Sequence, residues 1–450
     1  MLFMGLLFLV LPSLLAAKGE PDFITISFGR AVQGVRDIVS AFGDDGRSAS
    51  GGVRTIDLPA DDNEIPVTPP EEGTYFNAGD SRPIAETSDP VVATPAVPKP
   101  FGFRYVRQAA LTEEEQVIYD RLAGCLLSHA ESVPDLDPAA DVDKIVTAIQ
   151  QDYPEIFWFI GQYGTSTKLI NDQPVSMTFQ PSYIMDEEES ARLRVQIDAW
   201  EAQCLSGLSE SASDYDKVLY IYSYMAAHVD YGPNSNHQDG SDGQPSVYNS
   251  IVHVMADGYG VCGDYAKTVQ YLLNRLGIDC AYIIGQSKNA AHAWNLVWPD
   301  GVPTWIDATW GDPLMNGGEQ NTVPNYVYFG LTTADLMRNH IIDPAVPVPD
   351  CTSDAYNYFH RNGLYIRKYD EKTVTEAMVR ALRIDEDRVC LRFSDEAWQE
   401  ARTQLLDQPQ EKLSPILREA ITQSGSQAAW SGFQYMMDDE FCSITIGRKE

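Results

Sequence analysis

Apolar residues recur at helical spacing in several stretches of this chain, and each stretch is bounded by polar or turn-forming residues. The predicted helices cover residues 111–130, 141–153, 187–208 and 215–232. Thr112 stands at the expected N-cap of the first helix, and Pro154 ends the second. One alternating stretch, 174–185, predicts a strand. Residues 101–210 are therefore expected to form a mainly helical N-terminal domain.

A cysteine lies between glycines in DGYGVCGDYAKTVQYLL, residues 257–273. From Tyr265 onward apolar residues again follow helical spacing, and Gly277 is expected to close the helix. Cys262 therefore lies at or just before a helix N-terminus, where unsatisfied backbone N–H groups and the helix dipole stabilise an anion. That position favours a reactive thiolate, and the same N–H groups could receive a developing oxyanion.

The segment after this helix predicts strands. HAWNLVW and VPTWIDATW flank the turn residues Pro-Asp-Gly at 299–301, which predicts a β-hairpin over 291–309. The expected register places His292 directly opposite Asp307, with both side chains on one face. An imidazole beside a carboxylate is the base and orienting group that a cysteine nucleophile needs.

Each of these three residues also has an ordinary structural interpretation. Cys262 alone is typical of a small buried residue, His292 of a hydrogen-bonded strand histidine, and Asp307 of a strand end. Together, in the order Cys, His, Asp, they indicate a catalytic triad. The other histidines lack such a setting and are interpreted as structural or surface residues; they are His129, His228, His237, His253, His340 and His360.

Three motifs, GVCGDYA, HAWNLV and DGVPTWIDATWGDP, resemble the three motif blocks of the transglutaminase-like superfamily. The resemblance is strongest over 215–330, and DYPEIFWF at 152–159 also resembles a segment of extracellular bacterial members. It implies a papain-like core in which Cys262 is the nucleophile, His292 the general base and acid, and Asp307 the residue that orients His292. It also implies acyl transfer or hydrolysis on a protein or peptide.

The oxyanion and substrate-binding groups are less sharply defined. The backbone N–H of Cys262 is one expected oxyanion donor, and members of this superfamily often take the second from an upstream Gln or Trp. Gln244 lies in the right region, although the polarity of its loop explains it equally well. Trp294, Trp305 and Trp310 are expected to pack beside the site, where they either narrow it or serve as ordinary aromatic packing.

The C-terminal residues 351–450 alternate between strand-like and helical patterns, with helices expected at 371–384 and after the N-cap Ser394. No motif in them carries chemistry, so they are expected to recognise a substrate or to support the core. The chain is thus predicted to have an α+β fold. It combines a transglutaminase-like, papain-like core over 211–350 with a mainly helical N-terminal domain and a small C-terminal α+β module.

The N-terminal hundred residues differ in composition from the rest. Residues 1–17 are an apolar run that ends in small residues, which predicts a signal peptide although no Lys or Arg precedes the run. Residues 18–100 are rich in Pro and acidic residues and are expected to be a disordered linker. The protein is therefore expected to be secreted or located at the cell surface, with no membrane span in its mature chain.

Charge and cysteine content exclude further classes. The chain carries 32 Lys and Arg against 65 Asp and Glu, a net charge of −33, which argues against a nucleic acid or an anionic membrane as partner. Its 7 cysteines form no C-x-x-C pair, and their odd number predicts at least one free thiol. Neither a cofactor nor a metal site is predicted.

The main hypothesis is a secreted cysteine acyltransferase or hydrolase that acts on protein or peptide amides through a thioester at Cys262. Transglutaminase, deamidase and peptidase activities share this chemistry, so the residues leave the subtype open, as they do the oligomeric state. The alternative is a non-catalytic binding or scaffold protein of the cell surface that retains the fold. A zinc enzyme using Cys262, His292 and Asp307 ranks last, because it would have only three mixed ligands.

Overall fold

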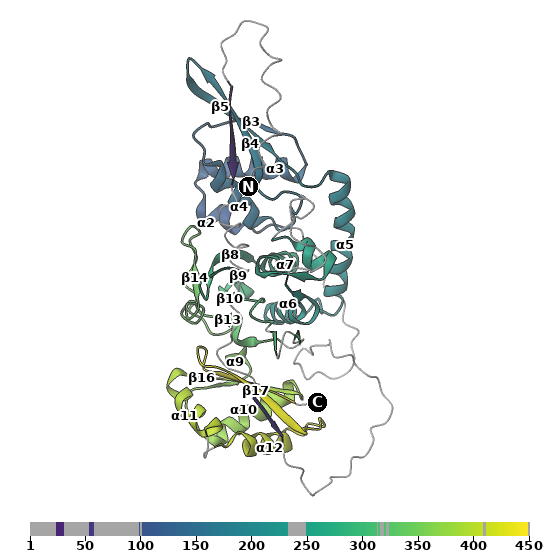
Figure 1. Cartoon of the computed structure of the whole chain (residues 1–450), viewed down its shortest axis with the longest axis vertical. Coiled ribbons are helices and arrows are strands. Elements are labelled where there is room, and N and C mark those ends of the chain that lie inside the picture. Colours follow the sequence, from purple (N-terminus) through teal and green to yellow (C-terminus); the bar gives the residue numbers. More distant parts are fainter. Residues whose placement is uncertain are drawn as a thin grey trace, which may run out of the picture.

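The computed structural model describes residue 99 and residues 101–232, 249–312, 324–407 and 411–448, together with the backbone of four short strands outside these ranges. Figure 1 shows three parts stacked along the long axis, with the N-terminal part at the top and the C-terminal part at the bottom. The fold is α+β, as predicted. The predicted signal peptide and Gln244 lie outside the described residues.

The N-terminal part packs helices against a four-stranded antiparallel sheet of order β1-β4-β5-β3. Its elements are β1 (Ile24–Arg30), α2 (Tyr105–Ala110), α3 (Glu113–Leu127), β3 (Val133–Leu136), α4 (Val142–Asp152), β4 (Gln162–Ile170), β5 (Gln173–Pro181) and α5 (Glu187–Leu205). The sequence predicted β5 but not β4, whose residues are mostly polar. The β4–β5 turn holds Asn171 and Asp172 at φ 50° and 61°, the left-handed conformation of a two-residue hairpin.

Helix starts in this part follow the sequence signals. Thr112 caps α3: its side chain accepts the Glu115 N–H, and the Glu115 carboxylate accepts the Thr112 N–H. Asp141 and Asp186 cap α4 and α5 in the same way, each accepting a backbone N–H from the first turn. The predicted N-cap at Thr112 is therefore confirmed.

The central part holds a five-stranded sheet of order β13-β10-β9-β8-β14, with α6 and α7 alongside it (Figure 1). Its helices are α6 (Asp214–His228), α7 (Cys262–Arg275) and α8 (Thr333–Leu336), with single turns η2 (His253–Asp257), η3 (Pro299–Gly301) and η4 (Tyr326–Tyr328). Its strands are β6 (Asp230–Tyr231), β7 (Tyr259–Gly260), β8 (Cys280–Ser287), β9 (Ala290–Val297), β10 (Thr304–Ile306), β11 (Leu314–Met315), β12 (Glu319–Gln320), β13 (Phe329–Leu331) and β14 (His340–Ile342).

Helix α7 ends as its sequence predicted. Gly277 has φ +78°, its N–H donates to the Asn274 carbonyl, and the Ile278 N–H donates to the Leu273 carbonyl. This is a Schellman motif, which satisfies two of the last carbonyls of the helix. The helix therefore begins at Cys262 and is closed by Gly277.

The predicted hairpin forms, but in a different register. Trp305 lies opposite Leu296 and Ile306 opposite Asn295, so Asp307 follows the end of β10 and His292 pairs with Gly285 of β8. The expected direct pairing of His292 with Asp307 is therefore wrong by two residues, because the turn is longer than assumed. A two-residue shift leaves side chains on the same face, so the two residues remain diagonal neighbours.

The C-terminal part is an α+β module with a five-stranded sheet of order β15-β16-β18-β17-β2. Its elements are β2 (Arg54–Asp57), α9 (Tyr358–Arg361), β15 (Tyr365–Ile366), α10 (Glu371–Ile384), β16 (Arg388–Phe393), α11 (Asp395–Leu406), α12 (Leu413–Ser424), β17 (Gly432–Asp438) and β18 (Ser443–Arg448). The predicted helix α10 and the N-cap Ser394 of α11 are confirmed. The strand-like stretch before α10 is mostly α9 and turn, with only the short strand β15.

Two short strands lie within 18–100, where the composition predicted a disordered linker. β1 pairs antiparallel with β4 in the N-terminal sheet, and β2 pairs antiparallel with β17 in the C-terminal sheet. The segments ITISFGR and RTID are rich in β-branched residues, which favours strands where a sheet edge is available. The linker interpretation is therefore wrong for these two stretches.

Most buried apolar residues of the three parts form one continuous cluster that extends from Val106 to Ile446, and Ala266, Tyr282 and Ala293 form a separate small cluster. All seven cysteines are buried and free, which confirms the prediction of at least one free thiol. No helix among the described residues has the length and apolar character that crossing a membrane requires.

Gly285 offers a test of how tightly the central sheet is packed. A Cβ added there would lie 2.1 Å from the Ile341 carbonyl oxygen and 2.6 Å from the Trp294 ring. We expect Gly285→Ala to lower the free energy of unfolding by about 1–3 kcal/mol, measured by urea denaturation. The control is Gly447→Ala, where a Cβ would meet nothing within 4 Å. Equal costs for the two variants would contradict the packing described here.

Candidate active site

Cys262 is the first residue of α7 and is fully buried. The buried carboxylate of Asp264 holds the start of this helix, because one oxygen accepts the Val261 N–H at 2.9 Å and the other the Ser250 N–H at 2.6 Å. Asp264 thereby joins the segment that precedes the helix to the turn that carries the cysteine. The N-terminal position predicted for Cys262 is confirmed.

Gly263, next to the cysteine, is required by a close neighbour. A Cβ at this position would lie 1.8 Å from Oδ1 of Asn249. Asn249 is buried, and neither polar atom of its side chain has a hydrogen-bond partner among the described residues. A buried amide without a hydrogen-bond partner costs free energy.

His292 connects Cys262 to Asp307. Its Nε2 lies 2.6 Å from Oδ2 of Asp307, and the Cys262 side chain lies near enough to the ring to help raise its pKa. Because Nε2 is engaged by the carboxylate, Nδ1 is the nitrogen left for the thiol. The structure therefore brings together the three residues that the sequence nominated for the triad.

Asp307 is held by four donors. Oδ1 accepts the backbone N–H groups of Thr309 and Trp310 at 3.0 and 3.1 Å. Oδ2 lies 2.6 Å from Nε2 of His292 and 3.1 Å from Nε2 of His340. Four contacts on two oxygens leave the carboxylate one orientation.

The protonation of the pair follows from these contacts. Burial alone would lower the pKa of His292, but the Asp307 charge and the hydrogen bonds to Asp307 and Cys262 raise that pKa above its ordinary value. Burial would raise the pKa of Asp307, but the His292 charge and the hydrogen bonds from His292 and His340 hold it well below its ordinary value. The buried pair is therefore an imidazolium beside a carboxylate.

The tryptophans nominated for the site differ in exposure. Trp294 is fully buried; its ring lies 5.8 Å from that of His292, so it packs behind the histidine rather than facing a substrate. Trp310 is partly exposed, 6.1 Å from the His292 ring, with the Lys288 ammonium 4.3 Å above it. Trp305 is buried and donates to the Thr333 hydroxyl, which gives it a structural role.

The side chains of His292, Asp307 and His340 lie close enough together for a metal ion to be considered. The 2.6 Å contact between His292 and Asp307 is that of a charge-assisted hydrogen bond. Ligands placed about 2.1 Å from one tetrahedral zinc ion would lie roughly 3.4 Å apart. We therefore assign these three side chains to hydrogen bonding.

The structure adds residues that sequence reasoning missed. His340 was interpreted as structural or surface, yet it lies on the triad aspartate. It is 33 positions beyond Asp307 and reaches the site because β14 pairs with β8, which no local pattern reveals. Asp264 could have been found, because an acidic residue at the third helical position is a helix-start signal.

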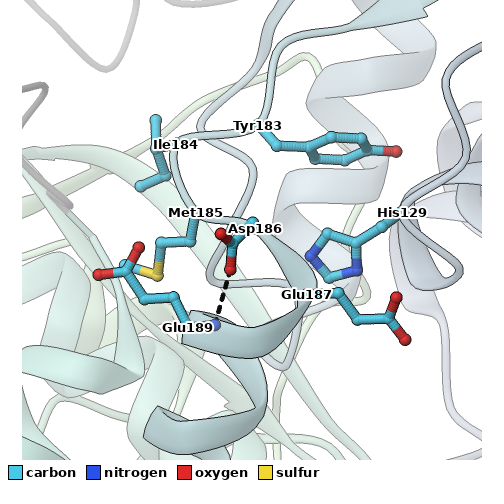
Figure 2. A pocket seen from close by; sticks show the side chains of 7 residues that line it. All are labelled: His129, Tyr183, Ile184, Met185, Asp186, Glu187 and Glu189. Atoms are coloured by element: carbon cyan, nitrogen blue, oxygen red, sulfur yellow. Dashed lines mark hydrogen bonds between the residues drawn. The ribbon is translucent and has the colours of Figure 1, made fainter.

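A cavity of about 420 Å³ lies in the N-terminal part, where His129 and Tyr183 face the start of α5 (Figure 2). Its acidic side chains, Asp186, Glu187 and Glu189, belong to the N-cap and first turn of that helix. Negative charge there stabilises the helix N-terminus, which explains these residues without a ligand.

Comparison with known proteins gives the class of this domain. Residues 203–309, which include the three triad positions, match the sequence model of the Transglutaminase-like superfamily. The chain therefore contains a transglutaminase-like domain.

Among curated proteins, the chain is 24% identical over 150 residues to the kyphoscoliosis peptidase of Mus musculus; the match covers 30% of this chain and 22% of that protein. Two crystal structures also overlap with it locally. One is a proposed cysteine protease from Cytophaga hutchinsonii, which is 19% identical to this chain. The overlap covers 33% of this chain and 57% of that chain, with a TM-score of 0.20. The other is a TGase, which is 17% identical to this chain. The overlap covers 35% of this chain and 46% of that chain, with a TM-score of 0.22.

The buried pair predicts how stability depends on pH. The lowered pKa of Asp307 stabilises the fold when the pH is above the pKa of this aspartate in the unfolded chain, near 3.9. This stabilisation is lost as the pH falls through the lower pKa of the folded protein. The raised pKa of His292 stabilises the fold when the pH is below the pKa of an unfolded histidine, about 6.5. This stabilisation is lost as the pH rises through the higher pKa of the folded protein. The stability gap between wild type and His292→Gln should therefore be widest between about pH 4 and 6.5. Urea denaturation across pH checks this, and a gap that keeps growing above pH 8 would contradict it.

Asp264 is predicted to matter more than an ordinary helix cap. Asp264→Ala leaves the buried Ser250 N–H and the partly buried Val261 N–H without this acceptor and should cost about 2–3 kcal/mol in urea denaturation. The matched control is Asp370→Ala, which removes a solvent-exposed cap on the Thr373 N–H and should cost less. A smaller cost at Asp264 than at Asp370 would show that Asp264 does not hold the start of α7.

Proposed function

We propose that this protein is a cysteine-dependent acyltransferase or hydrolase that acts on protein or peptide amides through a thioester at Cys262. The observation that carries the proposal is the buried chain of contacts from Cys262 to His292 to Asp307, within the segment that matches the transglutaminase-like superfamily. A nucleophile, a base and an orienting carboxylate in sequence are the parts that acyl transfer through a thiol requires.

The chemistry follows from these positions. The Cys262 thiolate attacks the amide carbon while His292, as the imidazolium, holds the proton that the thiol has given up. The resulting oxyanion receives hydrogen bonds, and the backbone N–H of Cys262 at the start of α7 is a donor at that point. His292 then gives the proton to the leaving amine, and the C–N bond breaks to leave a thioester on Cys262.

The second step decides the activity. Attack by a primary amine on the thioester forms a new amide and gives a crosslink, whereas attack by water gives deamidation or peptide hydrolysis. The mouse relative named as a peptidase supports the hydrolytic branch, although this chain spans only 22% of that protein. The apolar residues 1–17 support export, so we propose an extracellular or cell-surface protein or peptide as substrate.

The buried thiol also favours a second candidate. Cys262 is fully buried, and the side chain of His292 is only 7% exposed. The protein atoms that cover the sulfur must therefore move before a substrate carbonyl can reach it. A non-catalytic scaffold protein of the cell surface that retains the fold would show the same burial. Chemical reactivity of Cys262 distinguishes the two candidates, because a buried structural thiol is inert at neutral pH.

The test uses the full chain, Cys262→Ala, and Cys390→Ala as a matched control that removes another buried cysteine. Each is incubated with a glutamine-rich protein and a tagged primary amine, and intact masses are measured. We expect Cys262→Ala to lower product formation by roughly a thousandfold or more and Cys390→Ala to retain it.

The product identifies the activity. Incorporated tag indicates a transglutaminase, a gain of about one dalton per site a deamidase, and fragments a peptidase. No product in any channel, together with a wild-type Cys262 that iodoacetamide does not alkylate at pH 7, would overturn the enzyme proposal and favour the scaffold.

A further inference from the structure

A second imidazole reaches the triad aspartate from β14. Nε2 of His340 lies 3.1 Å from Oδ2 of Asp307, and the His340 side chain is fully buried. Trp294 packs edge-on against the His340 ring at 4.8 Å, and Tyr328 lies at 6.1 Å. The proposed mechanism assigns no step to this histidine, although it contacts the same carboxylate oxygen as His292.

Asn339 fixes the far side of the His340 ring. Nδ1 of His340 lies 2.6 Å from Oδ1 of Asn339, whose Nδ2 donates to the Tyr328 hydroxyl at 3.0 Å and to Oε2 of Glu440 at 2.9 Å. A carboxylate accepts and does not donate, so the amide nitrogen must face Glu440 and the amide oxygen must face His340. Glu440 therefore determines which group Asn339 presents to the histidine.

Glu440 belongs to the C-terminal module, which also holds the rest of this segment. Arg338 donates to both carboxylate oxygens of Asp395 at 3.0 Å and to the Glu440 carbonyl at 2.7 Å. The buried Arg392 of β16 pairs with Asp335 in α8. These contacts anchor both the start and the end of the segment 335–339 that leads into β14.

The contacts form one path from the module to the nucleophile: Glu440, Asn339, His340, Asp307, His292 and Cys262. We propose that the C-terminal module completes the active site, because Glu440 and Asn339 hold His340 in place and His340 orients the carboxylate that aligns His292. In this role His340 is a positioning residue that acts through Asp307. The inference rests on the proposed function, since it takes Cys262 and His292 as the reacting pair.

The hydrogen bonds at the two ring nitrogens of His340 add a physical link to Glu440. Acceptors face both of its ring nitrogens, Asp307 on one side and Asn339 on the other, so the protonated ring satisfies both contacts. Burial and the nearby His292 oppose protonation and lower the pKa of His340, while the Asp307 carboxylate favours it. Without Glu440, nothing fixes which group of the Asn339 amide faces Nδ1 of His340, so the ring that contacts Asp307 loses a fixed neighbour.

The experiment measures alkylation of Cys262 by iodoacetamide in the full chain from pH 5 to 10, with the modified residue identified by peptide mass spectrometry. It needs no substrate, so it reports on the triad alone. The variants are His340→Phe, which keeps a ring but no donor, His340→Gln, which keeps a donor, Glu440→Ala and Glu440→Gln. The control Asp387→Asn removes the exposed contact with Arg448 in the same module.

We expect His340→Phe to slow alkylation at pH 7 about tenfold and to move the half-maximal pH upward, because a poorly oriented Asp307 stabilises the imidazolium less. Glu440→Ala should slow alkylation about threefold and should also move the half-maximal pH upward. His340→Gln and Glu440→Gln should have smaller effects, and Asp387→Asn should have none. Thermal unfolding of each variant shows whether it is folded.

The outcomes separate the two proposals. A folded His340→Phe or Glu440→Ala protein with an unmoved or lowered half-maximal pH would overturn the positioning role, because lost packing alone changes stability and not the titration of the pair. If His340→Phe does not fold, the variants of Glu440, the partly buried end of the path, decide the matter. A wild-type Cys262 that is inert to iodoacetamide would instead overturn the proposed function itself.

Discussion

The 2.6 Å contact between His292 and Asp307 is the interaction on which the central part of the structure depends. Both side chains are buried, and an ion pair removed from water is costly unless every remaining polar atom is satisfied. Two backbone N–H groups and His340 complete the shell of Asp307, and Cys262 completes that of His292. The sheet order, the tight turn after β10 and the position of α7 can all be understood as means to bring these groups together.

The site is consequently a property of the whole chain rather than of one motif. Cys262 comes from a helix start, His292 and Asp307 from a hairpin, and His340 from a strand that pairs with β8 and follows a segment bound to the C-terminal module. The continuous buried cluster from Val106 to Ile446 makes relative motion of the parts costly. A module without chemistry of its own can therefore influence the geometry of a distant thiol.

Sequence reasoning reached the parts of the fold that are determined locally. The start of α7 at Cys262, its end at Gly277 and the N-caps Thr112 and Ser394 follow from short-range hydrogen bonding, which neighbouring residues specify. The register of the hairpin was wrong by two residues, although the alternation of faces preserved the pairing of His292 with Asp307. The role of His340 depends on contacts across long sequence separations, and no periodicity encodes them.

The N-terminal residues contribute one edge strand to the sheet of the N-terminal part and one to the sheet of the C-terminal part, β1 beside β4 and β2 beside β17 (Figure 1). A strand at the edge of a sheet carries a row of free N–H and C=O groups that invite pairing with another chain. An expressed chain that begins near residue 101 would expose β4 and β17 in this way. Self-association or precipitation of such a shortened protein would then reflect uncovered backbone, and it would say nothing about the natural assembly state of the full chain.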